Sequence, residues 1–403
     1  MDISIPTPIL EKILRINELS ILTEYDKYLN YWPLLLIGLI LSFLLTPIVG
    51  NIAKKYNLTY VPGKGKNDRE FDNPEKAVHD IETPSLGGVS IIVVVLLGIL
   101  LLFKPDATTI PILLALTVLA IGATLDDILV LSSKVQLGYQ ILAASIIAIS
   151  TIDFSSVSFF TDDFLNLSMY TWSFNIFSFP LSFVFPGDLI LIAWILLCIN
   201  SVKWVAGSPG LVESYSLVIF FLLFIIGIRT FSLFSSSISI LTAGAMISLL
   251  YFAYPPNQKI MSGSSGKSIY GFLIAILALV GGLKFSTTIM LLAIPIVDSI
   301  YVIIYRIIKY KPKNPIELMK INDTSHLHHR LLKLNLSRKQ VILIETAVSL
   351  LIGSFAILTV GAMRYFVLIF GIAFAISFVV FVNYKATKKD EEKPKSPESK
   401  YSY

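Results

Sequence analysis

The chain has 403 residues, of which 55% are hydrophobic and 15% carry a charge, and its mean hydropathy is +0.76. A soluble domain of this length would need far more charge to cover its surface, so this composition is typical of an integral membrane protein. The net charge of +5 identifies no partner by itself, and we expect no nucleic-acid binding. The single cysteine, Cys198, excludes a disulfide framework and a cysteine-based metal site.

The first segment, residues 1–31, spaces Ile9, Leu10, Ile13 and Leu14 between polar residues. This spacing predicts an amphipathic helix at the membrane interface, or an extension of the first span. Because a bilayer core needs about 20 apolar residues per helix, the region 32–384 is predicted to be an all-α polytopic domain. It contains eleven candidate spans, or ten if the weakest is left out: 32–50, 86–103, 110–125, 135–151, 188–204, 211–228, 231–252, 269–283, 286–308, 340–359 and 364–384.

Two segments differ from the spans in composition. Residues 152–187 contain no Lys or Arg and partly alternate apolar with polar side chains, which predicts a short β-hairpin resting on the membrane surface. Residues 385–403 are charged and contain prolines, which predicts a disordered tail.

Lysine and arginine are concentrated in the segments 51–85 and 309–339 and in the tail. The positive-inside rule then places these segments, with 125–134, 201–210 and 253–268, in the cytoplasm. The N-terminus and 152–187 are predicted to lie outside. We therefore expect a multi-pass protein of the plasma (inner) membrane, with its C-terminus and its polar connections on the cytoplasmic side.

Three of the four histidines, His326, His328 and His329, lie within four residues and are followed by Arg330. So dense a polar cluster in an apolar chain is hard to place in a core. It predicts the polar end of a site held at a membrane surface. The fourth histidine, His79, lies in another segment expected to face the cytoplasm.

A pair of acids, Asp126 and Asp127, ends the third predicted span. Adjacent carboxylates there are costly unless a divalent metal or a cationic partner offsets their charge. One of them could act as a base with a raised pKa, and a solvated helix end is the plainer alternative. Asp298, inside the ninth span, is a functional candidate because acids are rare within spans.

Glycines and serines mark two other connections. Gly87 and Gly88 allow a close backbone approach, either to a neighbouring helix or to a ligand. The segment 259–268 lacks the first glycine and the strand of a P-loop, but its backbone amides beside Lys267 could hold a phosphate.

In this order, the motifs resemble the polyprenyl-phosphate N-acetylhexosamine-1-phosphate transferases of glycosyltransferase family 4. The resemblance covers residues 35–345, and its most specific part is His326-Leu-His-His-Arg-Leu331. The other matching parts are Asp72-Asn-Pro74 with His79, Thr83-Pro84 with Gly87-Gly88, Asp126-Asp127 with Leu131-Ser132 and Gln140, Asn200 with Gly207 and Gly210-Leu211, and Pro295-Ile-Val-Asp298.

The resemblance implies a membrane enzyme that moves a sugar phosphate from a UDP-sugar to polyprenyl phosphate, with release of UMP and with Mg²⁺ at the cytoplasmic face. Such activity belongs to the synthesis of cell-wall peptidoglycan or another envelope polysaccharide, and a homodimer is left open. By resemblance, Asp126 and Asp127 are the catalytic residues, and Asp126 activates the lipid phosphate. The substrate-binding candidates are His79, Asn200, Lys203, Lys267, His326, His328, His329 and Arg330.

The chain departs from the family's pattern where metal ligands are expected. The second Asn of the loop after the fifth span is replaced by Lys203, and both acids of that loop are missing. A further metal-ligand Asp is missing near Ser264, which leaves Asp127 as the one weak metal candidate. The lysine expected after the Asp pair is displaced, since Gln136 occupies its place and Lys134 lies two residues away. Ser and Gly are poor ligands for a hard cation, so the sequence puts Mg²⁺ binding in question.

Three hypotheses remain. The protein is a transferase with impaired or altered catalysis, in which a lysine ammonium supplies the charge of the metal. Alternatively, it is a pseudoenzyme that binds polyprenyl phosphate or nucleotide sugar, or that scaffolds a glycan-assembly complex. A transporter or channel is the third hypothesis. It is disfavoured because the histidine motif and the Asp pair fit the family in order, and because no internal repeat is evident.

Overall fold

A computed structural model of the chain describes residues 6–14, 24–61, 65–66, 82–152, 154, 156–158, 164–176, 179–205, 207–256, 258–282, 285–314, 317–318, 321, 324–359 and 363–392. Its helices are α1 (Pro8–Leu14), α2 (Glu24–Leu29), α3 (Trp32–Lys55), α4 (Gly88–Leu102), α5 (Thr109–Leu129), α6 (Ser133–Ala148), α7 (Gly187–Val205), α8 (Leu211–Arg229), α9 (Leu233–Ala253), α10 (Gly263–Val280), α11 (Phe285–Leu291), α12 (Ala293–Tyr310), α14 (Leu327–Lys333), α15 (Arg338–Leu358) and α16 (Met363–Glu392). The strands are β1 (Thr59–Val61), β2 (Gly65–Lys66), β3 (Thr83–Pro84), β4 (Ser156–Ser158), β5 (Phe164–Asn166), β6 (Ser168–Ile176) and β7 (Phe179–Pro186).

Within these described residues, eight helices are long and apolar enough to cross a membrane, and α4 is a shorter apolar helix. Many of their apolar side chains are exposed, as Leu44 on α3 and Phe370 on α16 illustrate. Such exposure is what a surface facing lipid requires. The predicted fold class, an all-α polytopic membrane protein, is confirmed, and the number of eleven spans stays a prediction.

One predicted span is not a single helix. The segment expected to cross at 286–308 divides into α11 and α12, and the break falls at Leu292. Pro295 explains the break, because its ring would clash with the carbonyl four residues earlier in a continuous helix. Placed in the first turn of α12, the proline is tolerated, since backbone N–H groups there have no partner in the helix.

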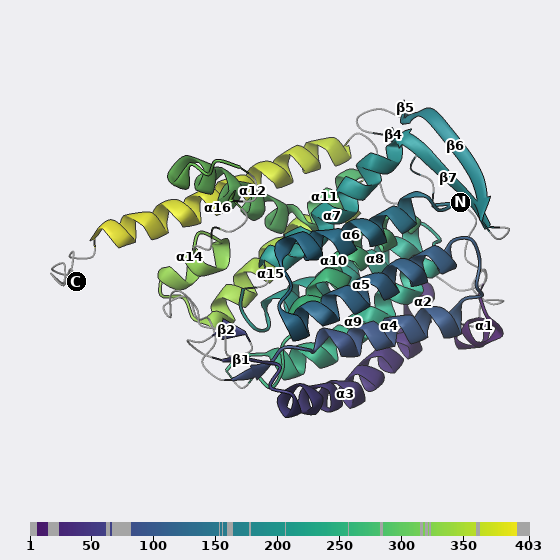
Figure 1. Ribbon diagram of the computed structural model, residues 1–403, viewed down its shortest axis with the longest axis horizontal. Coiled ribbons are helices and arrows are strands. Elements are labelled where there is room, and N and C mark those ends of the chain that lie inside the picture. Colours follow the sequence, from purple (N-terminus) through teal and green to yellow (C-terminus); the bar gives the residue numbers. More distant parts are fainter. Residues whose placement is uncertain are drawn as a thin grey trace.

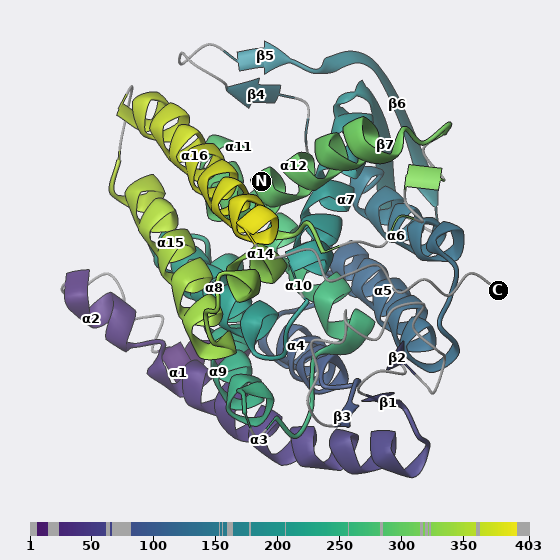
Figure 2. The same cartoon turned by 90° about the vertical axis from the view of Figure 1, so that its left-hand side faces the viewer.

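Helix α10 lies near the centre of the bundle (Figure 2), and α9 packs against α3, α4 and α8. Glycines allow the close contact between α3 and α9. A Cβ atom on Gly38 would lie 2.0 Å from the Leu241 carbonyl oxygen, and one on Gly244 would lie 2.0 Å from that of Leu35. Small residues facing each other let helices approach closely where lipid offers no hydrophobic driving force.

The two ends of the bundle differ. Strands β6 and β7 form an antiparallel hairpin, which confirms the predicted β-hairpin. Figure 1 shows this hairpin at the end of the bundle opposite to β1, β2 and α14. Tyr170 and Trp172 stack in the hairpin with 6.0 Å between their ring centroids, and both are largely exposed.

The terminal segments are also helical in part. Leu10 and Leu14 of α1 are fully buried, so they pack into the bundle while Ile9 stays exposed. At the other end of the chain, α16 continues to Glu392 and thus into the segment predicted to be a disordered tail. Lysine and alanine at the end of α16 are good helix formers, which is consistent with this extension. Residues 393–403 lie outside the described part.

Candidate active site

The carboxylate of Asp127 lies at the first turn of α10. Its two oxygens accept hydrogen bonds from the backbone N–H groups of Ser264 (2.7 Å) and Ser265 (2.8 Å), and the side chain is fully buried. A negative charge is favourable there, because the first amides of a helix carry partial positive charge. The sequence suggested that these backbone amides could hold a phosphate. In the structure, two of them donate hydrogen bonds to Asp127.

The segment before α4 runs beside the start of α10. The N–H groups of Gly87 and Gly88 donate to the carbonyl oxygens of Met261 and Ser262, each at 2.8 Å. A Cβ atom on Gly88 would lie 2.0 Å from the backbone nitrogen of Gly266. Of the two alternatives for these glycines, the structure therefore shows the approach to a neighbouring helix.

Asp126 lies one residue earlier and belongs to a different network. Its Oδ1 atom accepts from the Leu131 N–H (2.9 Å) and from the Gln136 side-chain amide (3.0 Å). The Gln136 oxygen in turn accepts a hydrogen bond of 2.7 Å from the Lys203 ammonium. Asp126 is buried and Lys203 half-buried. The glutamine thus connects a carboxylate at the end of α5 to a cation in the last turn of α7.

Asn200 lies one turn before Lys203 on α7. Its side-chain amide donates to the Gln140 oxygen of α6 at 3.0 Å, and to the Leu196 carbonyl oxygen at 2.9 Å. These bonds fix the end of α7 against α6. Asn200 therefore holds the end of α7, which carries Lys203, in position beside the Asp126 network.

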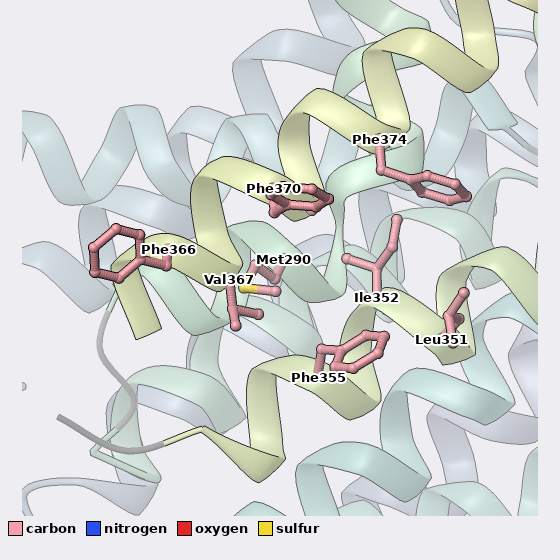
Figure 3. Close-up of a pocket in the computed structure, with 9 residues that line it drawn as sticks. Met290, Leu351, Ile352, Phe355, Phe366, Val367, Phe370 and Phe374 are labelled. Atoms are coloured by element: carbon pink, nitrogen blue, oxygen red, sulfur yellow. The ribbon is translucent and has the colours of Figure 1, made fainter. Parts of the chain in front are cut away.

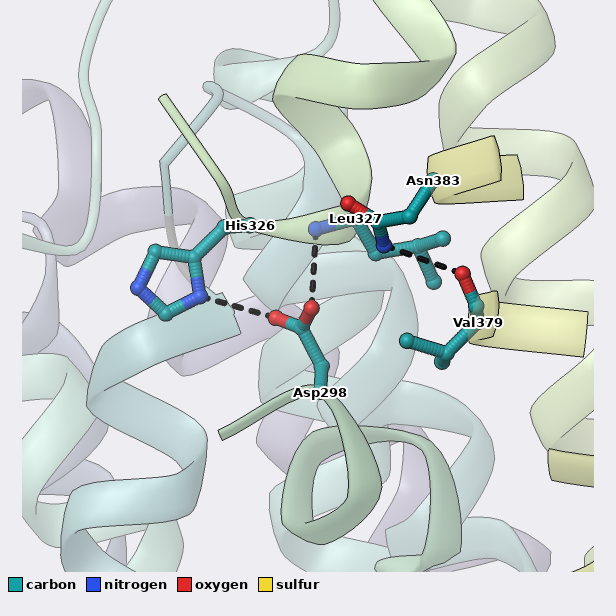
Figure 4. A network of polar contacts seen from close by, with 5 residues as sticks. All are labelled: Asp298, His326, Leu327, Val379 and Asn383. Atoms are coloured by element: carbon teal, nitrogen blue, oxygen red, sulfur yellow. Dashed lines mark hydrogen bonds and ion pairs between the residues drawn. The ribbon is translucent and has the colours of Figure 1, made fainter. Parts of the chain in front are cut away.

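Asp298 positions the histidine motif from α12 (Figure 4). One of its oxygens lies 2.8 Å from Nδ1 of His326, and the other accepts the Leu327 N–H at 2.8 Å. The carboxylate is buried and caps the first turn of α14, of which His326 is the N-cap residue. This acid, noted in the sequence because it falls inside a span, sets the position of the motif.

His328 is the most buried histidine of the motif, with 2% of its surface exposed. Its ring lies against Gly207, where a Cβ atom would come within 1.9 Å of Nε2, and its centroid is 4.3 Å from that of His329. Burial lowers the pKa of His328 well below its usual value, and His329, His326 and Lys267 lower it further. The ring is therefore neutral at pH 7 and lies near Lys267.

Arg330 belongs to the same motif but lines a different pocket, together with Tyr305 of α12. His79, the remaining predicted residue, lies outside the described residues. The structure thus brings the Asp pair, Lys203, Lys267 and the histidine motif to the end of the bundle that carries α14 (Figure 1).

One residue near the site was not selected from the sequence. Glu213, in the first turn of α8, is buried and accepts hydrogen bonds from the Ser262 N–H (3.0 Å) and hydroxyl (2.5 Å). Its second oxygen has no hydrogen-bond partner among the described residues. The available signal was its isolation, since it is the one acid between Leu189 and Val297.

The donor set does not fit a Mg²⁺ site built from protein carboxylates. In the part of the chain that the structure describes, no three His, Cys, Asp or Glu side chains converge as metal ligands. Asp127 already accepts two backbone N–H groups, and its neighbour at the start of α10 is the uncharged Ser264. A hard cation prefers anionic oxygen ligands, which Ser264 does not provide.

An apolar groove is separate from this site. A groove of about 390 Å³ lies between α11, α15 and α16 (Figure 3), lined by Met290, Leu351, Ile352, Phe355, Phe366, Val367, Phe370, Gly371 and Phe374. It is located toward the end of α15, whereas α14 precedes the start of that helix. Its described lining residues are all apolar side chains or glycine, so these residues offer a phosphate no polar side chain.

A bundle of apolar helices with ionisable residues gathered at one end defines a multi-pass membrane protein with a polar site at the membrane surface. The family model of glycosyl transferase family 4 matches residues 109–282, which include Asp126, Lys203 and Lys267. The chain is 28% identical over 320 residues to a probable undecaprenyl-phosphate N-acetylglucosaminyl 1-phosphate transferase of Bacillus subtilis, covering 77% of this chain and 79% of that protein.

It is also 29% identical over 277 residues to a phospho-N-acetylmuramoyl-pentapeptide-transferase of Clostridium botulinum, covering 67% of this chain and 77% of that protein. These matches agree with the resemblance carried by the motifs. Residues 109–282 thus belong to glycosyl transferase family 4, and most of the chain is similar to two transferases that act in the same kind of reaction.

Proposed function

We propose that this protein transfers a sugar 1-phosphate from a UDP-sugar, of the UDP-N-acetylhexosamine type, to polyprenyl phosphate for a cell-envelope glycan. The names of its relatives supply the reaction class. The observation that carries the proposal is the hydrogen-bonded series Asp126–Gln136–Lys203, which holds a carboxylate and an ammonium at one end of the bundle. A base that accepts a proton from the attacking phosphate and a fixed cation that stabilises the developing charge both assist such a phosphoryl transfer.

The chemistry must take place at the membrane surface. The lipid acceptor cannot leave the bilayer, and the nucleotide sugar cannot enter it. We infer that the end of the bundle carrying α14 faces the cytoplasm, where UDP-sugars are available, and that the hairpin of β6 and β7 lies outside. The concentration of Lys and Arg in 51–85 and 309–339 supports this orientation.

In the proposed reaction, an oxygen of the polyprenyl phosphate attacks the β-phosphorus of the UDP-sugar. The bond from this phosphorus to the bridging oxygen breaks, and UMP leaves with that oxygen. Asp126 accepts the proton of the attacking phosphate. Lys203 stabilises the negative charge that develops on the phosphoryl oxygens, since a pre-positioned cation in a site of low dielectric is most effective there.

The histidine motif would bind the nucleotide-sugar end. His328 is neutral and packed against Gly207, four residues after Lys203. A neutral imidazole can donate and accept hydrogen bonds without repelling the nearby ammonium groups. Lys267, close to this ring, would contact the diphosphate.

A second candidate function is supported by a specific observation. The carboxylate of Asp127 caps α10, and the described donor set does not fit Mg²⁺. A relative in which these acids stabilise the fold would bind polyprenyl phosphate or nucleotide sugar without transferring it.

The deciding experiment is UMP release by the purified protein with polyprenyl phosphate and a panel of UDP-sugars, with Mg²⁺ and with a chelator. Asp126→Asn is the test variant, and Lys313→Gln, in an exposed position, is its control. Release that Asp126→Asn abolishes and Lys313→Gln preserves supports the transferase. Absence of release, where an intact relative turns over, sinks that proposal, and thermal stabilisation by the same ligands then supports the binding protein.

A further inference from the structure

A polar pocket of about 240 Å³ lies between α12, α14 and α16, and no step of the proposed reaction uses it. Contacts of α12 and α14 with α16 hold its three walls together. Its lining combines basic side chains with hydroxyl groups: Tyr305, Lys309, Tyr310, Thr324, Ser325, Arg330, Lys333 and Thr387.

The pocket and the His328 contact lie on different faces of α14. Successive residues of an α-helix are separated by about 100°, so Arg330 projects about 200° away from His328. His328 lies against Gly207, at the end of α7, whereas Arg330 lies over the Tyr305 ring, 5.6 Å from its centroid. One short helix therefore separates two polar sites.

The described lining of the pocket is basic. Its lining contains three cations, Lys309, Arg330 and Lys333, and none of the eight described lining residues is acidic. Arg330 has 6% of its surface exposed, so its charge is largely removed from water. The Lys309 ammonium donates to the Tyr305 hydroxyl at 2.8 Å. A phosphate group in this pocket would be attracted by the three cations and would accept hydrogen bonds from the hydroxyl groups.

The adjoining surface of α12 indicates where such a phosphate comes from. Four isoleucines at helical spacing are each about half exposed or more on this helix: Ile300 (50%), Ile304 (52%), Ile307 (49%) and Ile308 (70%). An exposed apolar stripe in a membrane protein faces lipid chains. It ends next to Lys309, so the pocket is at the level where lipid headgroups lie.

We propose that this pocket binds the phosphate group of an anionic membrane lipid and thereby fixes α14, with its histidine motif, at the membrane surface. The site is separate from the phosphates that react, and it does not depend on whether the protein is an active transferase. A basic pocket between helices at a membrane surface is suited to anionic headgroups.

The test measures lipid binding to the full-length protein. Wild type and the double variant Lys309→Gln/Lys333→Gln are purified in detergent and incubated with vesicles of phosphatidylcholine alone or with phosphatidylglycerol. Bound lipid is measured by native mass spectrometry, and thermal stability is followed with phosphatidylglycerol and, separately, with inorganic phosphate. Lys311→Gln/Lys313→Gln removes two exposed charges from the same region outside the pocket and is the matched control.

We expect wild type and the control to retain phosphatidylglycerol in preference to phosphatidylcholine. The double variant should bind phosphatidylglycerol about 30-fold more weakly, because each lysine near an anionic headgroup contributes part of the affinity. Equal retention by all three proteins would overturn the proposal. Stabilisation by inorganic phosphate without stabilisation by phosphatidylglycerol would overturn the assignment to a lipid. If the double variant is poorly folded, Tyr305→Phe tests the same pocket, since it removes only a hydroxyl.

Discussion

The Lys203 ammonium lies 2.7 Å from the Gln136 side-chain oxygen, and it reaches Asp126 through that glutamine. The family's pattern has lysine where this chain has Gln136, and asparagine where it has Lys203. Two positions that are in contact have thus exchanged an amine and an amide. The exchange keeps one ammonium beside Asp126 but supplies it from α7 in place of α6.

Reversing this exchange is the most direct test of the Asp126 network. Lys203→Asn removes the ammonium, and Gln136→Lys places a second ammonium against Lys203, where like charges repel. We expect each single variant to lower UMP release about a hundredfold, which is typical for the loss of one group that stabilises developing charge. The double variant Gln136→Lys/Lys203→Asn should recover much of the activity. Additive losses in the double variant would show that the two positions act independently.

The contact between Gly207 and His328 predicts a coupled effect on stability. A Cβ atom on Gly207 would come within 1.9 Å of the His328 Nε2 atom, so Gly207→Ala must displace the ring. We expect a loss of about 1–3 kcal/mol in the free energy of unfolding, as for other overpacked sites. In a His328→Ala background the same change should cost much less. Thermal unfolding of the four proteins measures this coupling, and equal costs in both backgrounds would contradict it.

The close packing of Gly88, at the start of α4, against α10 predicts that a larger side chain there lowers the stability of the protein. A Cβ atom on Gly88 would lie 2.0 Å from the Gly266 backbone nitrogen, which cannot move without shifting α10. We expect Gly88→Ala to destabilise the protein by roughly 3 kcal/mol. Gly138→Ala on α6 is the matched control, because no atom lies within 4 Å of its added Cβ. It should leave the melting temperature unchanged or raise it, since alanine is the better helix former.

Burial of His328 predicts how stability depends on pH. Its folded-state pKa is lowered well below the model-peptide value of 6.5, so the folded state does not take up this proton when the unfolded state does. The contribution of neutral His328 to the free energy of unfolding is fully present above pH 6.5. It is lost as the pH falls from there toward the folded-state pKa. The contribution is about 1.4 kcal/mol per pH unit at most.

The measurement is the melting temperature of wild type and His328→Gln over this range of pH. Other carboxylates titrate in both proteins, so the difference between the two slopes isolates His328. The variant should lose less stability on acidification than wild type. Parallel curves would mean that His328 is not the group responsible.

Part of the protein could be predicted from the sequence because the relevant signals are local. The membrane class follows from long apolar runs, and a span needs only its own residues to be recognised. The alternating segment before α7 predicted a hairpin, and β6 and β7 form one. The histidine motif stood out through composition alone. Even the break at Leu292 has a local signal in the sequence, Pro295.

The tertiary structure decided what each polar residue contacts, because those contacts join positions that are distant in the sequence. Asp127 bonds to Ser264 and Ser265, so the sequence could not tell whether its charge is offset by a metal, a cation or a helix end. Gly87 and Gly88, at the start of α4, could have approached either a neighbouring helix or a ligand, and packing against α10 decided between them. Likewise, Arg330 follows His329 directly, yet the helical turn places it in a different pocket. An apolar span can be recognised from consecutive residues alone, whereas the partner of a charged residue depends on how the helices pack.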